Sequence, residues 1–321
     1  MSNIALQGAK GNKIANRQAI SETLLDLAKK NKDILVVTSD SRGSASLVEF
    51  GKQLPDQIVE VGIAEQNLVG IASGLAASGK KPFVASPACF LSMRSIEQIK
   101  VDVAYSNTNV KLIGISGGIS YGALGMSHHS LQDLAVTRAI PGLDVMMPAD
   151  RHEAKKMIEA LVEYDRPVYL RIGRNPVDDS YVSEDYEFQI GKAVTMKEGI
   201  DITIIATGET VRIALDSAEA LKQDGIDCRV INMHTIKPLD KETIIKAAEE
   251  TGRIITIEEH SIYGGLGSAV AEVVSQSHPV PVKILGLPDE PAIAGKTAEV
   301  FEYYGLSIEN VRKLAIQMVG K

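Results

Sequence analysis

The stretch Val61-Gly-Ile-Ala-Glu-Gln-Asn-Leu-Val-Gly-Ile-Ala-Ser-Gly-Leu-Ala76 decides how the first half of the chain is interpreted. It passes from a short β-type segment into a run whose apolar residues recur at helical spacing, which predicts a helix over 64–78. The apolar residues form one stripe that would face a core: Leu68, Val69, Ala72, Leu75 and Ala76. Glu65 is a lone carboxylate at the start of this helix.

Strands and helices alternate on both sides of this stretch. Short apolar, β-branched runs predict strands at 34–38, 82–86, 110–115 and 167–171. Amphipathic segments predict helices at 16–31, 92–105 and 150–164. This alternation indicates crossover units, and therefore an α/β domain with a mostly parallel sheet and helices on both of its faces.

The alternation stops near residue 174 and resumes near residue 202. The interval contains proline and five acidic residues between 175 and 187, which is typical of a linker. Beyond it, four strands at 202–206, 226–232, 253–258 and 282–287 alternate with helices at 210–223, 241–251 and 266–277. The sequence therefore predicts a first domain over 12–176, a linker over 177–190, and a smaller α/β domain over 191–321.

Composition excludes several classes of protein. The 321 residues are 45% hydrophobic and 23% charged, in the ordinary range for a globular chain. The net charge of −7 argues against a nucleic-acid binder that works by general electrostatics. Cys89 and Cys228 are too far apart in sequence to suggest a metal-ligand pair. Because no apolar run is long enough to span a membrane and Met1–Lys13 lacks a signal-peptide core, we expect a cytoplasmic protein.

Four polar or glycine-rich segments follow strands of the first domain, where parallel sheets bind their ligands. They are Ser39–Ser44, Gly62–Asn67, Pro87–Phe90 and the long segment Ser116–Ser130. From spacing alone, Glu65 has two interpretations, a functional carboxylate or an acid favoured by the dipole at a helix start. His128-His129 is a weak metal pair, since no carboxylate follows at ligand spacing. Gly264-Gly-Leu-Gly267 lacks the full spacing of a dinucleotide loop and predicts a turn before a helix.

The stretch 61–76 closely resembles the segment of transketolases in which a glutamate contacts the pyrimidine ring of thiamine diphosphate. Further segments resemble marks of the same family in the same order: Arg138–Leu143, Pro148–Asp150, Ile236–Asp240 and Gly264–Ser268. The resemblance covers almost the whole chain and implies a pyrimidine-binding domain followed by a transketolase C-terminal domain. It also implies thiamine diphosphate as the cofactor and Glu65 as its contact.

The Gly-Asp-Gly motif with which this family holds the cofactor diphosphate through Mg²⁺ does not occur in the sequence. The chain therefore resembles the C-terminal section of a split transketolase. The resemblance implies an N-terminal partner subunit that carries Gly-Asp-Gly and the Mg²⁺ ligands. It also implies self-association around the pyrimidine-binding domains, giving an α2β2 heterotetramer.

The resemblance assigns further site residues. Phe90 matches an aromatic that packs on the pyrimidine ring, although Pro87 stands where the family often has a second aromatic. His128 matches a histidine that reaches the substrate hydroxyls and is suited to proton transfer. Leu124 stands where the family has an aspartate that contacts a sugar hydroxyl.

Three more residues complete the predicted site. Arg174 and Ser44 match residues that bind the sugar phosphate. Asp40 begins the loop that approaches the thiazolium ring, with a helix N-cap as the alternative interpretation. Since His128 and Arg174 suit phosphorylated sugars, the sequence predicts transfer of a two-carbon ketol unit between sugar phosphates. The β-subunit of a 2-oxoacid dehydrogenase, half of a deoxyxylulose-phosphate synthase and an inert structural subunit remain alternatives.

Overall fold

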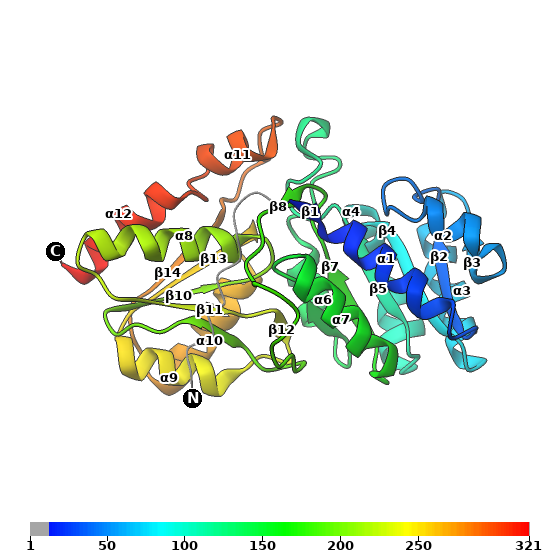
Figure 1. Cartoon of the computed structure of the whole chain (residues 1–321), viewed down its shortest axis with the longest axis horizontal. Helices are drawn as coiled ribbons and strands as arrows, with labels where there is room; N and C mark the ends of the chain where they lie inside the picture. Colours follow the sequence, from blue (N-terminus) through cyan, green and yellow to red (C-terminus); the bar gives the residue numbers. More distant parts are fainter. Residues whose placement is uncertain (1–12, 321) are drawn as a thin grey trace.

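The structure is a computed structural model that describes residues 13–320. The segment 1–12, on which the signal-peptide argument rests, lies outside the described residues. The chain forms two halves that lie side by side, each built on its own β-sheet (Figure 1). No helix between residues 13 and 320 combines the length and apolar character needed to cross a membrane.

The first sheet has seven strands in the order β12-β6-β7-β5-β4-β2-β3, and every pairing except β12–β6 is parallel. The strands are β2 (Ile34–Thr38), β3 (Ile58–Glu60), β4 (Lys81–Pro87), β5 (Lys111–Ile115), β6 (Asp144–Met146), β7 (Val168–Arg171) and β12 (Thr235–Lys237). The four predicted strands are confirmed. The three others have three residues each, too few to give a periodic pattern.

Helices cover both faces of this sheet because neighbouring strand residues point in opposite directions. Val36 packs with one set of helices and Val37 with the other. The first set is α1 (Asn16–Ala28), α2 (Val48–Gln53) and α7 (Arg151–Glu163). The second set is α3 (Glu65–Ala77), α4 (Ala88–Arg94), the π-helix η2 (Ile99–Tyr105) and α6 (Asp133–Ala139). The expected layered α/β architecture is therefore present.

The single helix predicted over 92–105 is wrong. The structure has α4, the short α5 (Ile96–Gln98) and the π-helix η2 in its place. The hydroxyls of Ser92 and Ser95 donate to the carbonyl oxygens four residues earlier, at 2.7 and 2.5 Å. Such back-bonding bends helices. Because α4 begins at Ala88, Phe90 lies in a helix and not in the predicted loop.

The second sheet has five strands in the order β14-β13-β10-β11-β9, parallel except for the edge strand β9. The strands are β9 (Val194–Lys197), β10 (Ile202–Ala206), β11 (Cys228–Asn232), β13 (Ile254–Ser261) and β14 (Val282–Leu287). Helices α9 (Lys241–Thr251) and α10 (Leu266–Ser277) pack on one face. Helices α8 (Thr210–Gln223), α11 (Thr297–Tyr303) and α12 (Ile308–Val319) pack on the other. This is the predicted smaller α/β unit.

Several segments join the two halves. Strand β12 belongs to the C-terminal half by sequence but pairs with β6 of the first sheet. In Figure 1, β12 lies near the junction of the two halves. Strand β1 (Ile14–Ala15) pairs with β8 (Pro176–Val177). The predicted linker contains no helix, and Ser180 and Tyr181 within it are buried. The two remaining 3₁₀ turns are η1 (Pro55–Gln57) and η3 (Gly122–Leu124). The domain limits stay a prediction.

Candidate active site

Glu65 is the first residue of α3 and only 4% exposed, at the edge of the first sheet where its parallel strands end. Gly62, just before it, has φ of +72°, a left-handed conformation that favours glycine. The Glu65 carboxylate pairs with the Arg94 guanidinium, whose Nη1 lies 3.1 Å from Oε1 and 3.2 Å from Oε2. Glu65 is therefore a buried carboxylate with a cationic partner, and its functional role stays a prediction.

Arg94 links Glu65 to Phe90. Its guanidinium carbon lies 4.2 Å from the centroid of the Phe90 ring, a cation–π contact. The two residues are four apart on α4 and so share one helix face. Pro87 is the last residue of β4 and directly precedes α4. The fixed φ of proline is compatible with this position at a helix start. Arg94 was not predicted as a site residue.

The Ser116–Ser130 segment, called here the 116–130 loop, continues this row of side chains. The His128 ring lies 5.3 Å from the Phe90 ring and 5.4 Å from the Tyr121 ring, in edge-on contact with both. Ser127 Oγ is 3.0 Å from His128 Nδ1. The guanidinium carbon of Arg174 lies 5.2 Å from the Tyr121 centroid. Contacts therefore run without interruption from Glu65 to Arg174.

Arg17 hydrogen-bonds to both residues predicted to bind the substrate phosphate, Ser44 and Arg174. Its Nη1 donates to the Ser44 carbonyl oxygen at 2.9 Å and its Nε to the Arg174 carbonyl oxygen at 3.0 Å. Burial lowers the pKa of Arg17, and the positive charge of Arg174 lowers it further. Arg174 Nη1 is buried without a hydrogen-bond partner. Two neighbouring guanidinium groups, one of them with a free donor, suit an anionic ligand.

A cavity of about 640 Å³ opens beside Arg174, between the two halves of the chain. Tyr121 and Arg174 line it from the first half, and Glu209 and Arg212 line it from the second. Its volume is in the usual range for small-molecule pockets. The side chains next to the row Glu65–Arg174 thus leave room for a ligand.

The remaining predicted residues lie around this row. Asp40 is exposed with φ of +53°, and its backbone N–H donates to Glu60 Oε1 at 2.6 Å. The next helix, α2, begins only at Val48 with Leu47 at its N-cap position, so the N-cap alternative is wrong. His129 is buried and its Nε2 lies 3.0 Å from the Gly122 carbonyl oxygen, whereas His128 contacts Phe90. Across residues 13–320 no three His, Cys, Asp or Glu side chains gather as metal ligands. Leu124 is 54% exposed.

Sequence reasoning missed Arg17, Arg94 and Tyr121. A spacing signal existed for Arg94, because residues four apart on a helix share a face. Arg17 and Tyr121 gave no such signal, since their partners Ser44 and Arg174 are brought to them only by the folded sheet.

Comparison with known proteins agrees with this geometry. The family model of the transketolase pyrimidine binding domain matches residues 12–178, and that of the transketolase C-terminal domain matches residues 191–311. An apulose-4-phosphate transketolase subunit of Phocaeicola vulgatus is 54% identical over 97% of this chain and 99% of its own. A 6-deoxy-6-sulfo-D-fructose transketolase subunit of a Clostridium species is 38% identical over 95% and 94%.

A solved structure described as a split gene transketolase, in the form of an inactive beta4 tetramer, superposes with a TM-score of 0.87. It is 37% identical, and the match covers 96% of this chain and 99% of that one. The chain therefore belongs to the transketolase family of thiamine diphosphate enzymes. Within that family it is the C-terminal subunit of a two-component transketolase, which transfers ketol units together with an N-terminal partner subunit.

Proposed function

We propose that this subunit, assembled with its partner, moves a two-carbon ketol unit from a phosphorylated ketose to an aldose phosphate. The observation that carries the proposal is the row of contacts from Glu65 through Arg94, Phe90, His128 and Tyr121 to Arg174. One end of the row offers a buried carboxylate beside an aromatic ring. The other end offers guanidinium groups. A cofactor ring and a sugar phosphate need these two environments in the same site.

At the first end, Glu65 and Phe90 fit the pyrimidine half of thiamine diphosphate. A buried carboxylate can hydrogen-bond a ring nitrogen, and a flat aromatic side chain can pack against the ring. When bound, the cofactor supplies the nucleophilic carbon that attacks the ketose carbonyl. Asp40 lies on the loop assigned to the thiazolium side. We assign Mg²⁺ and the diphosphate to a Gly-Asp-Gly motif of the partner in an α2β2 assembly.

At the second end, Arg174, Ser44 and Arg17 would hold the substrate phosphate. Arg174 brings a buried donor without a partner, and Arg17 fixes the backbone of both other residues. His128 lies between the two ends, where an imidazole can donate to a substrate hydroxyl or move a proton. This placement orients the sugar with its carbonyl toward the cofactor and its phosphate toward Arg174.

We propose a branched ketose phosphate of the apulose 4-phosphate type as the donor. Two observations support this choice. The relative of 54% identity is named for apulose 4-phosphate. Leu124, exposed at the end of η3, offers no acceptor to a sugar hydroxyl where the family has an aspartate. His129 does not replace that aspartate, because its ring is buried against Gly122.

The test reconstitutes the enzyme from this chain and its N-terminal partner and measures kcat/KM for apulose 4-phosphate and xylulose 5-phosphate as donors. We expect ketol transfer with phosphorylated ketoses and a preference for the branched donor. Equal or better use of xylulose 5-phosphate would refute the donor assignment alone. Turnover of a 2-oxoacid without ketol transfer would instead favour the dehydrogenase alternative. Location in the cytoplasm stays a prediction.

A further inference from the structure

The 116–130 loop carries His128 and Tyr121 but has little structure of its own. One antiparallel bridge closes its base, with Gly118 N–H donating to the Ser130 carbonyl oxygen at 3.0 Å and the reverse bond at 2.8 Å. Beyond that base it contains no helix longer than the three-residue turn η3, and its other internal backbone hydrogen bonds are those of turns, such as His128 N–H to the Gly125 carbonyl oxygen at 2.9 Å. A loop of this length needs outside contacts to hold two side chains in place.

One such contact comes from the chain after β7, where the Ile172 carbonyl oxygen accepts the Gly117 N–H at 2.9 Å, and further contacts come from β13 of the second sheet. The Glu259 Oε1 atom accepts the Ile119 backbone N–H at 2.8 Å, and both groups are buried. The Ser261 N–H donates to the Leu131 carbonyl oxygen at 3.1 Å. Strand β13 is thus hydrogen-bonded to both ends of the loop. The Glu259 side chain bonds to Ile119 near the start, and the Ser261 backbone bonds to Leu131 directly after the end.

Arg171, at the end of β7, holds Glu259 in this position. Its guanidinium is 1% exposed, with Nη2 donating to the Glu259 carbonyl oxygen at 2.6 Å and lying 3.8 Å from Oε2. The loop approaches this pair so closely that a Cβ at Gly117 would lie 2.1 Å from Arg171 Nε. A Cβ at Gly118 would lie 2.3 Å from the Glu259 carboxyl carbon. The loop base is therefore packed directly onto the Arg171–Glu259 pair.

We propose that Glu259 is a positioning residue of the transferase: from the C-terminal half it fixes the base of the 116–130 loop and so places His128 and Tyr121 for the substrate. The inference rests on the proposed function for the substrate role of His128. It gives the C-terminal half a part in the active site although none of its residues belongs to the row Glu65–Arg174.

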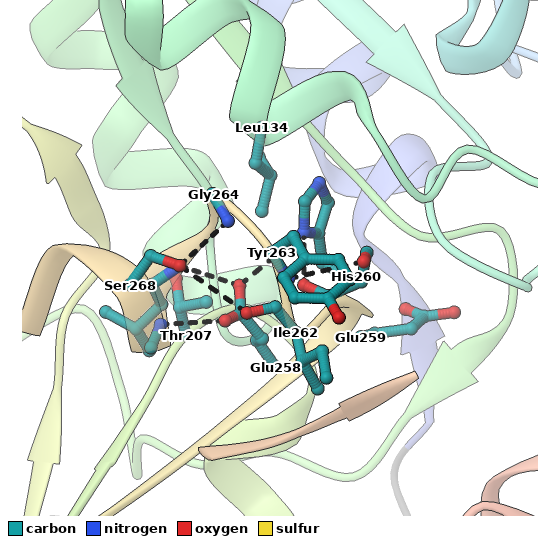
Figure 2. Close-up of polar contacts among 12 residues, drawn as sticks. Leu134, Thr207, Glu258, Glu259, His260, Ile262, Tyr263, Gly264 and Ser268 are labelled. Carbon is teal, nitrogen blue, oxygen red and sulfur yellow. Dashed lines mark hydrogen bonds and ion pairs between the residues drawn. The ribbon is translucent and has the colours of Figure 1, made fainter. Parts of the chain in front are cut away.

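The neighbouring Glu258 provides a matched control. The two carboxylates follow each other on β13 and are both buried, but they point to different sides of the strand (Figure 2). Glu258 accepts the backbone N–H groups of Leu266 and Gly267, each at 2.7 Å, and so caps α10. These hydrogen bonds stay within the C-terminal half and do not involve the loop base.

The experiment compares two conservative variants at position 259 in the reconstituted enzyme. Glu259→Gln keeps the acceptor oxygen for Ile119 but loses the charge that faces Arg171. Glu259→Asp keeps the charge but draws the acceptor back by one methylene. We expect Gln to keep a near wild-type donor KM and Asp to raise it about 10-fold or more, with kcat within about 3-fold, since misplaced binding groups act on substrate positioning. Glu258→Gln should leave KM unchanged.

Hydrogen exchange of the chain gives a readout independent of activity. Glu259→Asp should speed exchange of the amides over 118–130 about 10-fold, while Glu258→Gln should affect only the start of α10. Unchanged loop exchange in Glu259→Asp, or equal KM values for Asp and Gln, would overturn the proposal. If wild-type enzyme showed no ketol transfer, the proposed function would fail while the exchange measurement still decided whether Glu259 anchors the loop.

Discussion

Glu65 is buried and paired with Arg94, and its substitution tests whether the carboxylate takes part in the reaction. Glu65→Gln keeps the size of the side chain and one acceptor but cannot share a proton with a ring nitrogen in the same way. We expect turnover of the assembled enzyme to fall ~10²-fold or more, the usual scale for a positioned acid–base group. Steady-state kinetics with a ketose phosphate would measure it.

The control for Glu65 is Glu97→Gln, an exposed acid of the short helix α5. It should leave turnover unchanged. A folded Glu65→Gln enzyme with a near wild-type rate would mean that the carboxylate only pairs with Arg94 and that the assigned cofactor contact is wrong.

Leu124 is the residue at which donor choice should respond. A hydroxyl that the assembled enzyme buries against Leu124, away from water and without an acceptor, loses ~1–3 kcal/mol, a factor of about 5 to 150. Leu124→Asp should therefore shift the kcat/KM ratio toward xylulose 5-phosphate and away from a branched donor by that order. Met126→Asp places a new carboxylate on an equally exposed position of the same loop. With both donors compared at saturating partner concentration, it should not shift the ratio. Identical ratios in wild type and Leu124→Asp would remove position 124 from the specificity argument.

Among the secondary-structure elements, α7 depends most clearly on one side chain. Asp150 Oδ1 accepts the N–H groups of His152 and Glu153, each at 3.0 Å. Its Oδ2 accepts those of Ser180 and Tyr181, at 2.6 and 2.7 Å. Asp150→Ala would remove a helix cap and leave buried N–H groups without partners, so we expect a loss of about 2–4 kcal/mol in unfolding free energy.

Urea denaturation would measure this loss. Ser307→Ala is the matched control, because Ser307 precedes α12 without a side-chain cap bond and should cost less than about 0.5 kcal/mol. Equal stabilities of Asp150→Ala and Ser307→Ala would show that the cap and the chain around Ser180 hold without Asp150.

The sequence was informative where an element's pattern is local. Largely apolar segments of five residues predicted β2, β4 and β10, and the periodic stripe of Leu68 and Ala72 predicted α3. The three-residue strands β3, β6 and β12 could not be predicted, because they exist through pairing with distant neighbours. The break between α4 and η2 depends on side-chain bonds of two serines that composition alone does not order.

The candidate site follows the same rule. Glu65, Phe90, His128 and Arg174 were chosen from motifs, and the fold brings them into one row. The residues that connect them come together only through tertiary packing. The hydrogen bond from Ile119 of the 116–130 loop to Glu259 likewise joins positions 140 residues apart. Such a contact has no local sequence signal.

At the scale of the whole molecule, buried ionisable groups should make stability depend on pH. Burial raises the pKa of Glu153 to about 8 and that of Glu258 to about 7. It lowers the pKa of His234 and of His260 to about 4.

At pH 6.5 unfolded histidines are half protonated, and they become neutral as the pH rises further. Burial also lowers the pKa of Lys111 to about 7, which opposes the effect of the carboxyls. Burial raises the pKa of Glu209 and Glu259 as well, so the carboxyls outweigh the opposing groups. The folded chain then keeps protons that the unfolded chain has lost, and stability falls as pH rises.

We expect the unfolding free energy to drop by about 2 kcal/mol between pH 6.5 and 8, measured by urea denaturation of the isolated chain. Below pH 6.5 the histidines have the opposite effect on stability. Their imidazoles bind protons in the unfolded chain, whereas the buried rings of His234 and His260 stay neutral in the folded chain, so stability falls as the pH is lowered. Glu258→Gln should flatten part of the slope above pH 6.5. A stability that is constant or rises between pH 6.5 and 8 would contradict the burial of these carboxyls.

We predict that the N-terminal partner docks on the surface around the site. Four large apolar side chains that are more than half exposed lie within four residues of Glu65, Arg94 or His128: Ile63 (74%), Met93 (53%), Leu124 (54%) and Met126 (57%). Because clusters of exposed apolar groups mark interaction surfaces, we expect the partner to cover these side chains. The isolated chain should therefore show no ketol transfer and weak thiamine diphosphate binding by calorimetry, and mixing with the N-terminal partner should restore both.

Placing a charge in that surface separates assembly from folding. Ile63→Asp should leave the isolated chain folded but raise the partner concentration needed for half-maximal activity at least ~10-fold, because the new carboxylate would be desolvated in the interface. Ile200→Asp changes an equally exposed isoleucine in the loop before β10, in the second half of the chain, and should have no such effect. Turnover by the single chain, or an unchanged partner titration for Ile63→Asp, would mean that the surface beside Glu65 is not where the two subunits meet.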